Sequence, residues 1–312
     1  MLAVYDLTER LVRPLAGPKW AGYFAEFLMF GLREAQACCF AGSFFLLLAI
    51  SKHLQISGLA RYDMLFLGGL AIQATLLALR LESPREVAVL SLFHLLGVGL
   101  ELFKTSPAIA SWSYPEPSLL HIGTVPLYSG FMYSAVASYL MQAWRLLQVR
   151  LEDAPPVPLS LGLGGLIYAN FFTHHLWIDL RWGLALAVVA LFWRCRVRFI
   201  VVGQERRMPL PLSFLLTGFF IWIAENIATF FGAWTYPHQR QGWEVVGLGK
   251  ISSWTLLVIV SFILVACLRQ QNESRCLERK VAGAAGIEPA NAGTKNRCLT
   301  AWRRPNREGS AP

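Results

Sequence analysis

The feature that most constrains this chain is the recurrence of apolar stretches about twenty residues long. A soluble protein of 312 residues has no core large enough to bury so many of them. Each is long enough to cross the hydrocarbon of a bilayer as a helix. We therefore predict an all-α, polytopic membrane helix bundle of about eight transmembrane helices. The expected spans are 24–50 (which could be two shorter elements), 62–80, 87–106, 122–145, 158–174, 177–193, 208–231 and 247–268.

The net charge of +9 does not indicate a nucleic-acid partner, because of where the charges lie. The tail after Leu268 holds nine Lys or Arg residues against four Glu, and most other basic residues occupy alternate predicted loops. This is the positive-inside pattern, which predicts that both termini are cytoplasmic. The lipid bilayer is the expected partner, and the oligomeric state is left open.

Composition divides the chain into five parts. Residues 1–23 form a predicted cytoplasmic amphipathic segment, because acids are mixed with bases and no signal-peptide apolar region is present. The Pro-rich linker at 150–157 separates two four-helix halves, 24–149 and 158–268. Residues 269–312 are predicted to be a disordered basic tail. Its string AGAAGIEPANAGTKNRCLTAWRRP resembles reading frames that run over a stable-RNA gene, so we do not interpret its charge.

Two segments of the predicted halves match each other. ELFKTSPAIASWSYP at 101–115 and ENIATFFGAWTYP at 225–237 each carry Glu, then Thr four residues on, then Trp-x-Tyr-Pro. Each segment lies at the outer end of the third predicted helix of its half. Because each half has four helices, both copies point the same way across the membrane. We therefore predict a parallel internal duplication.

Glu101 and Glu225 are the first candidate catalytic residues. Each is expected roughly 5–10 Å inside the apolar boundary, where an unpaired carboxylate costs up to about 3 kcal/mol. Each should therefore face the interior of the bundle, where a protonated Glu could donate a proton to an apolar substrate. The alternative is that each carboxyl group caps and packs against a neighbouring helix.

Aromatic and hydroxyl side chains near these carboxyl groups are the candidate substrate-binding residues. Aromatic belts at the membrane interface are ordinary and would explain the rings without any site. In the functional interpretation the rings form the wall of a pocket above the carboxylates and stabilise a cation. The candidates are Trp112, Tyr114, Trp234, Tyr236, Thr105 and Thr229, together with Asn170 from the next cluster.

The densest polar cluster is NFFTHHLWIDLRW at 170–182. His174, His175 and Asp179 are candidate catalytic residues there, because their spacing suits a proton relay or a zinc ion. Adjacent histidines do not easily share one metal, and the sequence has no HExxH or HxxxH motif, so we predict no metal site. A hydrogen-bonded interfacial turn is the alternative. The sequence leaves any cofactor unknown.

Four stretches carry a resemblance to a known family: FGLREAQACCF, WSYPEPSLLHIGTVPLYSGFMYSAVASYL, NFFTHHLWIDLR and FGAWTYPHQRQGWEVVGLGKISSW. Through them, residues from about 26 to 270 resemble a family of bacterial integral membrane proteins, domain of unknown function number 817. The resemblance implies a location in the bacterial plasma (inner) membrane and conveys no activity.

A second, looser resemblance rests on Glu-x-x-x-Thr, Phe-Gly-x-Trp-x-Tyr and Gly-x-Val-Pro-Leu. Here these elements are Glu101 with Thr105 and Glu225 with Thr229, then 231–236, then 123–127. The pattern is similar to membrane carotenoid hydratases of the bisanhydrobacterioruberin hydratase type. In this chain the elements are divided between two repeats, and Trp stands where Tyr is usual.

The function that these observations favour is a membrane-embedded enzyme that modifies a lipid or isoprenoid by hydratase-like acid catalysis. A buried Glu would donate the proton, the Trp and Tyr rings would stabilise positive charge, and His174 or His175 would handle water. One alternative is a transporter of a small solute or ion, because buried carboxylates beside histidines also suit proton-coupled transport. Another is a non-catalytic membrane subunit. Walker, dinucleotide-binding and GxSxG motifs are absent from the sequence.

Overall fold

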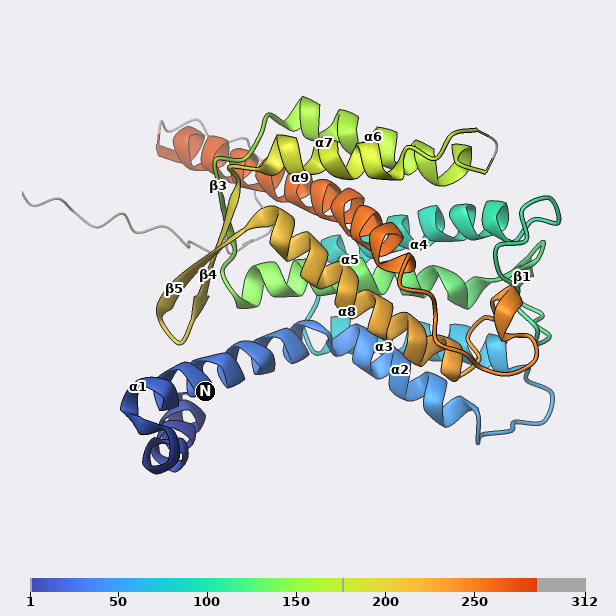
Figure 1. The fold of residues 1–312 in the computed structure, drawn as a ribbon, viewed down its shortest axis with the longest axis horizontal. Coiled ribbons are helices and arrows are strands. Elements are labelled where there is room, and N and C mark those ends of the chain that lie inside the picture. The colour runs from blue at the N-terminus through green and yellow to red at the C-terminus, as the bar shows by residue number, and fades with distance from the viewer. Residues whose placement is uncertain (1, 176, 285–312) are drawn as a thin grey trace, which may run out of the picture. The chain divides into compact units, whose positions relative to one another are not determined.

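The computed structural model describes residues 2–175 and 177–284, and the chain divides into two compact units, 1–265 and 266–312. Helices dominate the first unit (Figure 1). In chain order the elements are α1 Leu2–Ala37, α2 Cys39–Ser51, α3 Arg61–Ala78, α4 Pro84–Lys104, β1 His121–Ile122, β2 Val125–Pro126, η1 Leu127–Ser129, α5 Gly130–Leu146, β3 Arg150–Glu152, α6 Val157–Thr173, α7 Arg181–Phe192, β4 Arg196–Val201, β5 Gln204–Pro209, α8 Leu210–Phe230, η2 Pro237–Gln239 and α9 Lys250–Ala284.

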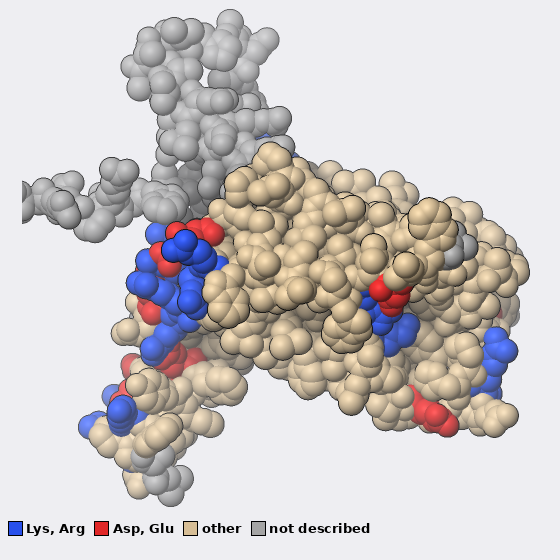
Figure 2. Space-filling model, turned by 45° about the horizontal axis from the view of Figure 1, so that its top comes forward, with Lys and Arg blue, Asp and Glu red and all other residues tan. Residues whose placement is uncertain are grey.

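Three of the described helices are long and apolar enough to cross a membrane: Pro84–Lys104, Leu210–Phe230 and Lys250–Cys267. The number reaches four if Gly17–Ala37 and Cys39–Ser51, which are bent by 68° relative to each other, count as one broken span. On the face shown in Figure 2, charged side chains gather toward two ends and leave a broad band of other residues between them. These features support a membrane protein, whereas the predicted eight spans are not confirmed.

Two predicted helices and the predicted tail differ from the observed elements. The helix predicted at 24–50 is broken at Cys38, between α1 and α2. The helix predicted at 122–145 begins only at Gly130, because the residues before it form the hairpin of β1 and β2. The helix α9 extends to Ala284, into the segment from residue 269 that the sequence predicted to be a disordered tail, and this stretch contains several Arg, Gln, Glu and Ala residues, which favour helix. Residues 285–312 of that predicted tail lie outside the described residues.

A small antiparallel sheet was not expected in an all-α bundle. Its strand order is β3-β4-β5, and β4 pairs with both neighbours. The sheet therefore joins the predicted linker at 150–157 to the Arg-rich connection between α7 and α8. Arg198 of β4 forms ion pairs with Glu152 of β3 and with Glu205 of β5. This sheet and the short strand β1 lie at opposite ends of the helices (Figure 1).

Close helix crossings place the polar residues described below. A Cβ atom added to Gly97 of α4 would lie 2.3 Å from the ring of Tyr133 on α5. A Cβ atom added to Gly218 of α8 would lie 2.2 Å from the hydroxyl of Thr255 on α9 and 2.9 Å from its backbone. Small residues allow membrane helices to approach in this way. Each Glu-bearing helix, α4 and α8, therefore contacts the helix that follows the matched segment of its own half.

Candidate functional site

The two matched Trp-x-Tyr-Pro segments, which follow α4 and α8, lie side by side. The Ser113 N–H donates to the Thr235 carbonyl at 3.0 Å, and the Thr235 N–H donates to the Ser113 carbonyl at 2.9 Å. This reciprocal exchange is the pattern of a hydrogen-bonded antiparallel pair. Segments more than a hundred residues apart thus meet at their equivalent central residues.

Glu101 of α4 is buried, with 2% of its surface exposed. Its Oε2 accepts hydrogen bonds from Trp112 Nε1 and from the Tyr114 hydroxyl, both at 2.7 Å. Its Oε1 accepts a hydrogen bond from the Tyr133 hydroxyl on α5 at 2.8 Å. Since the indole N–H can only donate, Trp112 requires an acceptor at this place. Glu101 therefore sits in a cradle of three fixed donors.

Glu225 of α8 is equally buried, at 2% exposed, and has a related cradle. The Tyr236 hydroxyl donates to its Oε1 at 2.5 Å, and Trp254 Nε1 on α9 donates to its Oε2 at 2.6 Å. In both predicted halves, then, the carboxylate accepts a hydrogen bond from the Tyr hydroxyl of its own Trp-x-Tyr-Pro segment. It also accepts a hydrogen bond from one aromatic side chain near the start of the next helix, Tyr133 or Trp254. The predicted inward orientation of both carboxyl groups is confirmed.

Lys250, the first residue of α9, joins the two cradles. Its Nζ lies 4.5 Å from the centroid of the Tyr236 ring and 5.3 Å from that of the Trp112 ring. These two rings contact each other edge to face, with centroids 6.0 Å apart. Because Trp112 bonds Glu101 and Tyr236 bonds Glu225, one ammonium group lies between the donors of both carboxylates. The sequence predicted that these aromatic rings would stabilise a cation of the substrate. In the structure the cation that lies over the Trp112 and Tyr236 rings is the ammonium group of Lys250.

Lys104 organises the predicted histidine cluster. It ends α4, is 6% exposed, and its Nζ lies 2.8 Å from His175 Nε2 and 3.5 Å from His174 Nε2. An ammonium group can only donate, so the facing ring nitrogens act as unprotonated acceptors. Burial first, and then the positive charge of Lys104, lower the pKa of His175 to about 4. Burial likewise lowers the pKa of His174, whose Nδ1 lies 2.7 Å from the Asn170 carbonyl.

Asp179 and Asn170 hold the turn between α6 and α7. The Asp179 carboxylate accepts the Arg181 backbone N–H at 2.9 Å and forms an ion pair with its guanidinium at 3.1 Å. Burial alone would raise the pKa of Asp179, but these contacts hold it below its ordinary value. The Asn170 side chain accepts the Leu180 N–H at 3.2 Å. These two residues thus form the hydrogen-bonded turn that the sequence offered as its alternative. Among the described residues, no group of three or more His, Cys, Asp or Glu side chains is arranged to hold a metal ion.

The remaining predicted substrate-binding residues serve the surrounding frame. The Thr105 hydroxyl bonds the Glu101 carbonyl at 2.9 Å and the Thr124 hydroxyl at 2.7 Å. The Thr229 hydroxyl donates to the Asn226 carbonyl at 3.1 Å. Trp234 is buried in an aromatic core that includes Phe residues of α2 and α5. The alternative for the aromatic residues was a belt at the membrane interface. Trp234 is too deeply buried to belong to such a belt.

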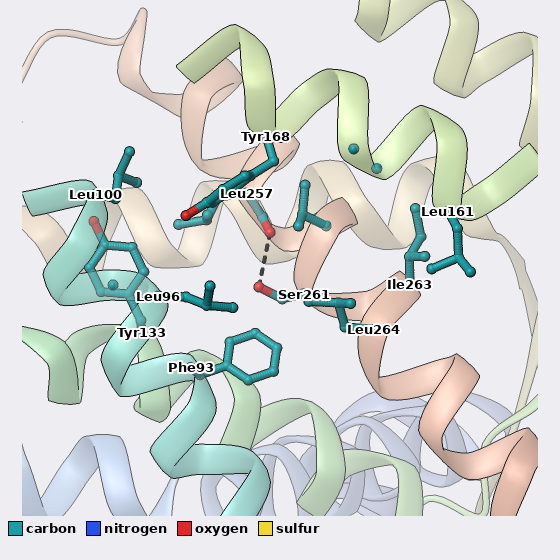
Figure 3. Close-up of a pocket in the computed structure, with 14 residues that line it drawn as sticks. Phe93, Leu96, Leu100, Tyr133, Leu161, Tyr168, Leu257, Ser261, Ile263 and Leu264 are labelled. Carbon is teal, nitrogen blue, oxygen red and sulfur yellow. Dashed lines mark hydrogen bonds between the residues drawn. The ribbon is translucent and has the colours of Figure 1, made fainter. Parts of the chain in front are cut away.

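An apolar pocket of about 250 Å³ lies beside the Glu101 cradle (Figure 3). Residues of α4, α5, α6 and α9 line it, among them Leu96, Leu100, Tyr133, Tyr168, Leu257 and Ser261. The Ser261 hydroxyl is engaged with the Leu257 carbonyl at 3.0 Å, so the wall presents mainly carbon. Tyr133 belongs to both features, because its ring lines the pocket and its hydroxyl bonds Glu101. The sequence did not single out Tyr133, Trp254, Lys104 or Lys250.

Comparisons with known proteins find one family and one uncharacterised relative. The family model described as "Protein of unknown function (DUF817)" matches residues 26–262. The "Uncharacterized protein YoaT" of Bacillus subtilis (strain 168) is 51% identical over 248 residues, which cover 80% of this chain and 93% of the relative. No solved structure matches. The predicted family is confirmed, and the similarity to carotenoid hydratases stays a prediction.

Proposed function

We propose that this chain, which belongs to the DUF817 family of proteins of unknown function, is a membrane-embedded enzyme that modifies a lipid or isoprenoid. The topology that goes with this proposal has eight spans in two parallel halves, with both termini in the cytoplasm. The helix α4, which carries Glu101, is one of the candidate membrane spans. A substrate dissolved in the bilayer would therefore reach the site from the side of the helices.

The observation that carries the proposal is that one side chain, Tyr133, joins an apolar pocket to a buried carboxylate. A pocket lined by carbon suits a hydrocarbon chain, because its wall packs against the chain and presents few polar groups that would be left without a hydrogen-bond partner. A phenol backed by a carboxylate supplies the polar group that a reaction needs. The combination suits a substrate with a long apolar part and one reactive end.

The chemistry that this pair can perform is general acid–base catalysis. When a substrate hydroxyl gives its proton to the Tyr133 oxygen, the phenol passes its own proton to Glu101. The phenol remains neutral, the substrate becomes an alkoxide and the carboxylate becomes an acid. The reverse sequence delivers a proton to the substrate. In this scheme Glu101 acts through Tyr133, which differs from the direct donation by Glu101 that the sequence suggested.

A proton-linked transporter is the second candidate function. It is supported by three ionisable residues in candidate spans, the buried Glu101 and Glu225 and the partly buried Lys250. Lys250 lies over the Trp112 and Tyr236 rings, which bond the two carboxylates. Ionisable residues within spans commonly mark proton or ion pathways. Against it, the pocket offers few polar atoms to a solute. Proton-linked uptake of a solute by proteoliposomes, abolished by Glu225→Gln, would favour the transporter over the enzyme.

The test of the enzyme compares the lipids of cells that express the full chain with those of cells that express variants. Tyr133→Phe and Glu101→Gln should each abolish the lipid change that the wild-type protein causes. Glu82→Gln is the matched control, because Glu82 is also buried (3% exposed) and hydrogen-bonded, to Ser138, but does not line the pocket. If the membranes show the same lipids with wild-type protein and with Tyr133→Phe, the proposal is wrong.

A further inference from the structure

Three of the helices that line the pocket carry a basic residue at the same end. On α4, Lys104 follows the lining residue Leu100 by four positions. On α9, Lys250 precedes the lining residue Leu257 by seven positions. Residues four or seven apart share one face of a helix and are about 6 or 10 Å apart along its axis. Both ammonium groups therefore lie on the pocket side of their helices, beyond its apolar wall.

The third basic residue is His175, which follows the end of α6. Its position is fixed by its contact with Lys104, at 2.8 Å. Phe103, which precedes Lys104, also contacts the His175 ring, with centroids 6.2 Å apart. Lys104, His175 and Lys250 are called the basic rim below. It comes from the three helices α4, α6 and α9 that also line the pocket.

Within residues 2–175 and 177–284, the cations of the basic rim have no carboxylate partner in contact. No described carboxylate forms an ion pair with Lys104 or Lys250. Asp179, the nearby acid, is paired with Arg181. Glu101 and Glu225 attract Lys250 at longer range, but the aromatic donors already occupy their oxygens. In the part of the chain that the structure describes, the hydrogen-bond partners of the Lys104 ammonium group are the uncharged rings of His174 and His175. An anionic oxygen would stabilise this buried ammonium group further.

We propose that the pocket and the basic rim bind a single amphipathic lipid that has an anionic phosphate headgroup. Its apolar chain lies along the pocket wall, and its phosphate accepts hydrogen bonds from Lys104, Lys250 and His175. The inference rests on the proposed function and deepens it by naming the class of substrate. The wall runs about 10 Å along α9, from Leu257 to Leu264, which suits a single chain. Prenyl phosphates and glycerolipid phosphates share this headgroup chemistry.

The test measures binding to the full-length protein in an uncharged detergent. Farnesyl phosphate is the main probe, farnesol has the chain without the charge, and inorganic phosphate has the charge without the chain. Farnesyl phosphate should bind at least about tenfold more tightly than either, because each lacks one of the two contacts. Competition with oleoyl lysophosphatidic acid, a glycerolipid phosphate with one chain, distinguishes the two lipid sources. If it displaces the probe at a lower concentration than unlabelled farnesyl phosphate does, the phosphate site stands with a glycerolipid as its ligand.

Variants of the basic rim test where the phosphate lies. Lys104→Gln should weaken farnesyl phosphate about tenfold and leave farnesol unchanged, and Lys104→Arg should retain most of the affinity. Lys52→Gln removes the same charge from a residue that contacts Phe230 instead and should have no effect. Lys250→Gln provides an independent variant if Lys104→Gln does not fold. Equal binding of farnesol and farnesyl phosphate, unchanged in both variants, would overturn the phosphate site while the lipid enzyme stands. Failure of every lipid to bind would overturn both proposals.

Discussion

Removing the acceptor from the Glu101 cradle should destabilise the protein by an amount that depends on what replaces it. In Glu101→Leu, three buried donors, from Trp112, Tyr114 and Tyr133, lose their acceptor. An unsatisfied buried donor costs about 1–3 kcal/mol, so the loss is about 3–9 kcal/mol before rearrangement. The two phenols can rotate toward other acceptors, but the indole N–H cannot change its role. We expect a net destabilisation of about 3–5 kcal/mol.

Glu101→Gln should be milder, because the amide oxygen can still accept from Trp112 and Tyr114. Its NH₂ group would then face the Tyr133 oxygen, which can accept instead of donating. Each of the two retained hydrogen bonds is weaker by about 1 kcal/mol, because its acceptor is no longer charged. This destabilisation is offset in part, because the folded protein then buries one charge fewer. Glu101→Leu should therefore be less stable than Glu101→Gln by about 2 kcal/mol.

The assay is thermal unfolding of the purified full chain, followed by tryptophan fluorescence, for wild type and both variants under identical conditions. Tyr168→Phe is the control for a lost phenol in the same pocket. Tyr168 lines the wall without a described hydrogen bond, so its variant should remain within about 0.5 kcal/mol of wild type. If Glu101→Leu proves as stable as wild type, or as Glu101→Gln, the three-donor cradle is not present in the protein.

Three further predictions concern other parts of the site. Because the pKa of His175 is lowered from 6.5 to about 4, the unfolded chain binds the proton first, so stability should fall as the pH drops from about 6.5 toward 4. His175→Gln should flatten part of that decline, and unfolding curves that fall equally in both proteins would contradict the assignment. Gly97→Ala should destabilise the α4–α5 crossing by about 1–3 kcal/mol, whereas Gly99→Ala, whose added Cβ meets nothing within 4 Å, should not; equal melting temperatures would refute the close approach. Cysteines at Ser113 and Thr235, in a background without native cysteines, should form a disulfide within one chain, since hydrogen-bonded antiparallel pairs have Cα atoms about 5.5 Å apart. Failure to cross-link under oxidation would show that the two matched segments do not lie side by side.

The matched segments are the part of the site that the sequence could predict. Glu101 and Glu225 stand in apolar stretches, where a carboxylate must turn inward and find donors. The donors Trp112, Tyr114 and Tyr236, eleven to thirteen positions after their Glu, are within reach once the chain turns back on its helix. Repetition of the same order, Glu with Thr four residues on and then Trp-x-Tyr-Pro, in both predicted halves distinguished these residues from ordinary interfacial aromatics.

The residues that complete the site come from other helices, and local pattern does not place them. Tyr133 and Trp254 lie about thirty positions from their carboxylates and have no neighbouring polar pattern. Lys250 begins an apolar helix, where a basic residue is commonly interpreted as a contact to solvent or headgroups. Lys104 falls near the end of the predicted span 87–106, and the sequence did not single it out. The contacts of these residues follow from helix crossings such as the one at Gly97, which a single sequence does not specify.

The sheet shows the same limit for the fold. Its strands come from the linker at 150–157 and from the connection between α7 and α8, each of which alone has the composition of a charged loop. The pairing of β3 with β4 is long-range, and charges such as Arg198 and Glu152 hide the alternation that would reveal strands. By contrast, the helices predicted near 62–80, 87–106 and 208–231 agree closely with α3, α4 and α8, because continuous apolar stretches need no distant partner to be recognised.

The central claim, that a lipid chain occupies the pocket beside Tyr133, is tested most directly by native mass spectrometry of the protein purified from membranes. Gly165→Leu fills the pocket from α6, since an added Cβ at this lining residue meets nothing within 4 Å. Gly162→Leu, on the same helix and equally open but away from the pocket, is its control. We predict that wild type and Gly162→Leu carry one bound lipid for each chain and that Gly165→Leu carries none. A wild-type protein without bound lipid, or a Gly165→Leu variant that retains the same lipid, would contradict the account.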